Sequence, residues 1–169
     1  MAKKLYGTDP DQVPTNADLG RIAFQDIAFE SGTWTPTITD SAYNTYTGSY
    51  TQRAGNWMKV GNMVWLQGFL NWSASLVSNG LTSGNQLYIV GQPFANITSS
   101  LNEPVLAVQA ASGITISGQI AGFMVSGADY VRFRDVSSNA AYSNMTVGGF
   151  DNGTGGRLIA FAGVYQAAE

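Results

Sequence analysis

The stretch from Tyr50 to Trp72 limits the possible folds of this chain more than any other part of the sequence. Gly61-Asn62 divides this stretch, and both residues favour the tight turn of a β-hairpin because they tolerate positive φ at little cost. After the turn, every second residue from Val64 to Trp72 is apolar or glycine, which predicts a strand with one face in a core. We therefore expect a β-hairpin whose second strand is Met63–Trp72.

The opposite face of that second strand is also more than half apolar, since it carries Met63, Trp65 and Phe69. A strand with one solvated face normally alternates cleanly between apolar and polar residues. Two interpretations remain open: an ordinary strand of a sandwich core, or a central strand whose second face is covered by another subunit. On the second interpretation, these three residues form a subunit interface.

The rest of the chain predicts an all-β fold, because short apolar runs are separated by turn signals at about 8–12-residue spacing. We expect an antiparallel β-sandwich, jelly-roll-like, over residues 32–169. Thr33–Thr39 contains Pro36 and fits a first or edge strand. The other expected strands are Leu87–Val90, Val105–Ala111, residues 114–125 with an interruption at Gly118, Asp129–Val136, Met145–Val147 and Leu158–Tyr165.

Residues 1–31 differ in composition from the remainder, since they hold eight charged residues against eleven in residues 32–169. Pro10 and Pro14 favour extended or turn conformations, and an apolar segment follows them. We expect an extended N-terminal arm that anchors the protein to a partner, the alternative being a frayed terminus. The candidate anchoring residues are Leu5, Tyr6, Val13, Leu19, Ile22, Phe24, Ile27 and Phe29.

Composition bounds the function. Only 11% of residues are charged and the net charge is -3, which argues against nucleic acid as a partner. The chain has no Cys and no His, so thiol and imidazole chemistry and the commonest zinc ligands are excluded. We expect no cofactor and no metal. We also expect no membrane insertion, because no apolar run approaches the ~20 residues of a membrane helix, and the N-terminus lacks the apolar core of a signal peptide.

The carboxylates predict no enzyme. Asp129 and Asp135 lie six residues apart on one strand, which separates them by roughly 20 Å. A glycosidase needs two carboxyl groups within roughly 5–10 Å. A distant pair such as Asp40 and Glu103 could meet in the fold, but no pattern in the sequence indicates it. Asp151 opens a glycine-rich segment that we interpret as a tight turn rather than a phosphate or calcium loop.

Aromatic residues gather in the first half of the chain. Trp34, Trp57 and Trp72 fit core positions, where aromatic side chains of β-sandwiches mostly lie. Tyr43 and Tyr46 fall in a polar connection, so they are candidate glycan contacts: sugar C–H faces stack on aromatic rings.

Several of these residues form a recognisable pattern. Residues 32–36 read GTWTP, residues 50–64 read YTQRAGNWMKVGNMV, and residues 89–94 read IVGQPF. This resembles a β-sandwich module that recurs in tail fibres and related virion proteins of tailed bacteriophages. Trp57 stands where Tyr is common in that module, and Gln92 where Leu is common. The likeness covers most of residues 5–94 and the last strand, and residues 100–150 match only in character.

The resemblance implies a homotrimeric virion protein, assembled in the host cytoplasm and attached to other virion proteins through its N-terminal arm. It further implies host recognition by multivalent contact with surface glycan, in which weak sites gain from avidity. The alternative is a capsid decoration protein or a tail adaptor without receptor-binding activity. A third class, a capsule-degrading enzyme, would need a carboxylate pair that the sequence does not show.

Overall fold

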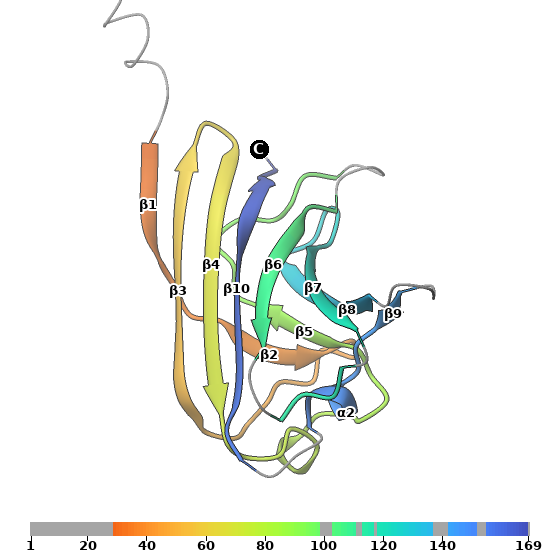
Figure 1. The fold of residues 1–169 in the computed structure, drawn as a ribbon. Helices are drawn as coiled ribbons and strands as arrows, with labels where there is room; N and C mark the ends of the chain where they lie inside the picture. Colours follow the sequence, from red (N-terminus) through yellow and green to blue (C-terminus); the bar gives the residue numbers. More distant parts are fainter. Residues whose placement is uncertain are drawn as a thin grey trace, which may run out of the picture.

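The structure is a computed structural model that describes residues 29–98, 103–110, 113–116, 118–136, 142–151 and 155–168. It confirms an all-β antiparallel sandwich over these residues (Figure 1). The predicted N-terminal arm falls almost wholly outside the described residues. So do seven of the candidate anchoring residues, Leu5, Tyr6, Val13, Leu19, Ile22, Phe24 and Ile27.

The front layer of the sandwich contains the longest strands. Its strands follow the order β1-β3-β4-β10-β6, and each is antiparallel to its neighbours (Figure 1). Their bounds are β1 Phe29–Trp34, β3 Tyr50–Val60, β4 Met63–Trp72, β10 Arg157–Gln166 and β6 Val105–Ala110.

The back layer continues from β6 and crosses behind the front strands in the order β7-β8-β5-β2. The end of β6 pairs with β10, while its start pairs with β7, so a single sheet bends around the core. A short strand, β9, pairs with β8. The bounds are β7 Gln119–Met124, β8 Tyr130–Val136, β5 Leu87–Val90, β2 Thr37–Asp40 and β9 Ser143–Asn144.

The chain changes layers at Thr35-Pro36. We expected one strand over Thr33–Thr39, but β1 pairs with β3 in the front layer and β2 pairs with β5 in the back layer. Pro36 has no backbone N–H to give to a ladder, so the point between the two strands suits it. The first strand also begins at Phe29, three residues before the predicted start of the sandwich.

The predicted hairpin is confirmed. β3 and β4 pair from Val60↔Met63 onwards, and Gly61 in the turn has φ 59°. The burial of β4 alternates as the sequence predicts, with Val64, Leu66, Gly68, Leu70 and Trp72 all buried. Trp34 and Trp72 lie in the core as expected, whereas Trp57 is half-buried and packs against it.

Two small elements depart from the sequence prediction. We expected a strand over Met145–Val147, but β9 ends at Asn144 and a short helix, α2, spans Val147–Phe150. A 3-10 helix, η1, spans Val77–Asn79. The ring of Phe150 in α2 lies 5.5 Å from that of Phe133 in β8, so the helix closes one end of the core.

The apolar core lies between the two layers. Its largest fully buried side chains are Trp72, Tyr165, Phe133, Phe150, Ile38, Leu66, Leu70, Leu76, Leu87, Ile89, Leu106 and Met124. In the part of the chain that the structure describes, no helix has the length and apolar character needed to cross a membrane.

Candidate binding surfaces

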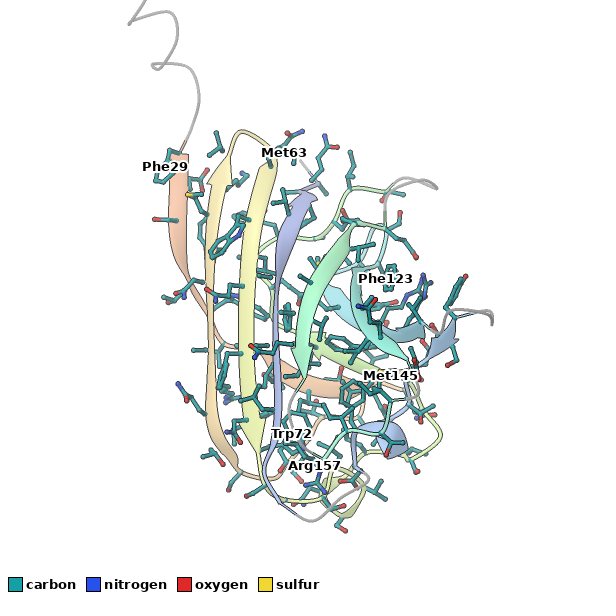
Figure 2. All side chains as sticks on the ribbon, in the orientation of Figure 1. Phe29, Met63, Trp72, Phe123, Met145 and Arg157 are labelled. Atoms are coloured by element: carbon teal, nitrogen blue, oxygen red, sulfur yellow. The ribbon has the colours of Figure 1, made fainter. Side chains whose placement is uncertain are left out.

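The outward side of the front layer carries a continuous apolar surface. The ladder places Phe29, Val60 and Met63 in one row across β1, β3 and β4. The next row on the same face holds Met58, Trp65 and Val164 across β3, β4 and β10. All six side chains are exposed. We call these six residues the apolar patch; Figure 2 shows two of them, Phe29 and Met63, at the same end of the sheet.

The surface around the apolar patch is uncharged. Glu30 and Lys59 are register partners in the row between these two rows, and their charged groups are 3.6 Å apart. This row also holds the buried Val64, so it belongs to the inward side of the layer. None of the described outward-facing positions of β1, β3, β4 and β10 holds Asp, Glu, Lys or Arg. Besides the patch, these positions are Ser31, Thr33, Gln52, Ala54, Asn56, Gln67, Phe69, Asn71, Leu158, Ala160, Ala162 and Gln166.

The three predicted subunit-interface residues therefore share one face. Met63 is 47% exposed, Trp65 is 37% exposed and Phe69 is half-buried. Phe29, which we assigned to the anchoring arm, is instead the first residue of β1 and belongs to the apolar patch. The predicted hairpin connects Met58 with β4, but no sequence pattern connected Phe29 or Val164 with it, because strand pairing brings these two residues there.

The outward side of the back layer has a different character, since aromatic and charged residues alternate across it. The ladder aligns Tyr88, Arg132 and Phe123 across β5, β8 and β7. Tyr130 stacks on Tyr88 with the ring centroids 4.2 Å apart.

Arg134 lies at the centre of this surface. Its guanidinium carbon is 4.4 Å from the centroid of the Phe123 ring and 4.3 Å from that of Tyr142. Each contact is a cation–π interaction, and both rings hold the guanidinium plane in place. The same group donates a hydrogen bond to Glu103 at 3.1 Å, and Glu103 also accepts one from Arg132. We call Glu103, Phe123, Arg132, Arg134 and Tyr142 the arginine cluster.

The two tyrosines predicted to contact glycan lie in different environments. Tyr43 is 70% exposed and adopts a positive φ of 62°. Tyr46 is only 4% exposed, and its hydroxyl donates to the carbonyls of Ser49 and Ala74. The ring of Tyr46 is part of the core, so the expectation of an exposed Tyr46 is wrong.

Asp40 organises the loop that carries Tyr43. Its buried carboxylate accepts hydrogen bonds from the backbone N–H groups of Ala42, Asn44 and Thr82 and from the side-chain amides of Asn44 and Asn85. Burial alone raises the pKa of Asp40, but these hydrogen bonds outweigh that effect and lower it to about 2. Asp40 is therefore a structural anion rather than a general base.

Asp151 has a similar structural role, since both aspartates hold the connection between β4 and β5. It accepts hydrogen bonds from Ser75 Oγ and from the N–H groups of Leu76 and Val77, and it lies 3.3 Å from the Arg157 guanidinium. Burial raises the pKa of Asp151, while these hydrogen bonds and the Arg157 charge together bring it below its ordinary value. Figure 2 places Arg157 beside Trp72.

Asp40, Glu103 and Asp151 thus have structural partners. Asp40 and Glu103, which we considered as a pair that could meet, are held by different groups on different elements. Within the described ranges, no three Asp or Glu side chains gather in a way that could hold a metal ion.

The sequence predicted two residues of the apolar patch, Met63 and Trp65, as an interface, and it did not predict the arginine cluster. The alternation of Arg132 and Arg134 along β8 was visible, and both do lie on one side of the strand. Glu103, Phe123 and Tyr142 come from three other segments, and no spacing in the sequence links them. A comparison with models of known families finds no match to this chain. A search of curated proteins finds no match either.

Proposed function

We propose that this chain is a non-enzymatic structural protein of a tailed-bacteriophage virion, a short tail-fibre-like protein that assembles as a homotrimer. In this proposal the N-terminal arm attaches it to other virion proteins, and the sandwich contacts glycan on the host surface. The sequence resemblance of residues 32–36, 50–64 and 89–94 supports the assignment to phage virion proteins.

The observation that carries the proposal is the apolar patch on an uncharged sheet face. Contiguous apolar surfaces of this kind are uncommon on monomers, where they mark interaction sites. Burial of Met63, Trp65 and Val164 against another copy removes them from water at no electrostatic cost, because no charged group on that face loses its hydration.

The geometry supports separate roles for the two layers. The patch begins at Phe29, which follows the proposed attachment segment in the sequence and lies at the same end of the sheet as Met63 (Figure 2), and this supports attachment and self-association near that end. Because the arginine cluster lies on the opposite side of the sandwich, burial of the front face leaves the cluster exposed to other partners.

The test is a reconstruction of the intact particle that gives the position and the copy number of this protein. Density at the tail in a small multiple of three supports the proposal. Density spread over the capsid shell in hundreds of copies identifies a capsid decoration protein and rules out host recognition as the main role. Density at a junction between other fibres identifies a tail adaptor.

A further inference from the structure

The arginine cluster on the back layer has the composition of a saccharide site. We propose that it binds a neutral saccharide, with the Tyr142 ring as the stacking surface and with Glu103, Arg132 and Arg134 as hydrogen-bonding partners of the hydroxyl groups. This inference rests on the proposed contact with glycan, and it gives that contact a location and a ligand class.

Tyr142 is exposed but contacts Arg134. Its side chain is 59% exposed although one face of the ring lies against the Arg134 guanidinium. Arg134 in turn contacts the Phe123 ring and donates a hydrogen bond to Glu103. An exposed ring that is already immobile loses little conformational entropy when a ligand stacks on it.

Other polar groups bond to the guanidinium group that the Tyr142 ring contacts. The Glu103 carboxylate is bonded by two guanidinium groups, yet its side chain remains about one-third exposed. Asn144 in β9 accepts a hydrogen bond from Arg134 Nε at 3.4 Å, which places an amide beside the same guanidinium group. A few fixed donors and acceptors next to an aromatic surface match the alternating hydroxyl and C–H faces of a sugar.

Charge selects the ligand class. Arg132 and Arg134 both bond to the Glu103 carboxylate, so each guanidinium group already has an anionic partner. The whole chain carries a net charge of -3. A phosphate or carboxylate would have to compete with Glu103 for the two guanidinium groups, on a chain whose net charge is negative, whereas hydroxyl groups can bond to the cluster without displacing its ion pairs.

The experiment is an array of bacterial surface saccharides, both neutral and acidic, probed with the full-length protein and three variants. Tyr142→Ala removes the stacking surface and is expected to weaken binding to neutral saccharides about tenfold or more. Tyr142→Phe keeps the ring and is expected to bind within about threefold of the unmodified protein. Tyr43→Ala tests the other exposed tyrosine, which the sequence made a candidate glycan contact, and this variant retains binding if the arginine cluster is the site.

Each other outcome overturns the proposal. Preference for acidic saccharides contradicts the ligand class, and loss of binding in Tyr43→Ala with retention in Tyr142→Ala moves the site to the loop that follows Asp40. Absence of saccharide binding leaves the back layer without this role and favours a protein partner. None of these results concerns the place of the protein on the particle. The saccharide site can be refuted while the virion assignment stands. Conversely, the virion assignment can be refuted while the site binds sugar.

Discussion

The ring of Phe161 in β10 lies directly over Gly68 in β4, in the space that a side chain at position 68 would occupy. The two residues are register partners in neighbouring strands, and Phe161 is buried in the core. Trp34 lies over Gly55 of β3 in the same way. Gly55 and Gly68 are themselves register partners, so two adjacent glycines admit two large rings from neighbouring strands.

Gly68→Ala is therefore expected to destabilise the fold by about 1–3 kcal/mol, since the added methyl group displaces the Phe161 ring in a closely packed core. Chemical denaturation monitored by tryptophan fluorescence measures the change. Gly84→Ala is the matched control, because a methyl group at Gly84 meets open space. Equal stability of the two variants would show that the core accommodates the methyl group freely.

Trp65→Lys is expected to dissociate the proposed oligomer while leaving the subunit folded. Trp65 faces outward and lies opposite Val164 in the apolar patch, so a lysine there places a charge in the middle of the proposed interface. Sedimentation velocity and circular dichroism together measure assembly and folding. Val77→Lys, at an exposed position in η1 far from the patch, serves as the control. An oligomer that survives Trp65→Lys would refute the assignment of this face to the interface.

Deletion of residues 1–28 is expected to abolish incorporation into the virion without unfolding the sandwich. The cut leaves β1 complete, because that strand starts at Phe29 and pairs with β3 along its whole length. A longer deletion, of residues 1–31, removes half of β1 and would confuse attachment with stability. Particles purified from cells that express the shortened chain should lack it on immunoblots, and its presence there would contradict the anchoring role of the arm.

Acid is expected to weaken the fold through Asp40. The folded-state pKa of Asp40 is about 2, below the ordinary value of 3.8, so its contribution is fully present above about pH 4 and is lost as the pH falls toward 2. The shift corresponds to about 2 kcal/mol. Urea unfolding at pH 5, 4, 3 and 2 should show Asp40→Asn less stable at pH 5, with the difference shrinking at lower pH. A difference in the free energy of unfolding that stays constant with pH would mean that the charge of Asp40 does not contribute to stability. Asp129→Asn, at an exposed aspartate, is the control.

Arg157→Met is expected to cost about 3–5 kcal/mol, because it leaves the Asp151 carboxylate without its buried partner. It also frees the carbonyls of Ser73 and Ala74, which accept hydrogen bonds from Arg157. Thermal unfolding gives the comparison with Lys59→Met, which breaks the more exposed pair with Glu30 and should cost under about 1 kcal/mol. Similar losses of stability in the two variants would indicate that burial does not increase the contribution of the Arg157–Asp151 pair.

Local pattern was sufficient to predict the hairpin, because side chains alternate along a strand and Gly61-Asn62 marks the turn. The division at Pro36 was not predicted, since Thr33–Thr39 alternates as one strand would and only the pairing partners separate its halves. The burial of Tyr46 was missed for a related reason: its hydroxyl bonds to Ala74, 28 residues away. The helix α2 was not predicted because Gly148 and Gly149 are poor helix formers.

The position of β10 between β4 and β6 has a consequence for synthesis on the ribosome. The hairpin of β3 and β4 can form early, but in the described part of the chain it is joined to β6 only through β10, which emerges about 85 residues after the end of β4. A product that stops short of β10 therefore exposes two unpaired strand edges and the buried side of β4. We therefore expect proteases and chaperones to act on such a fragment, and we expect only chains that include β10 to fold into a stable subunit.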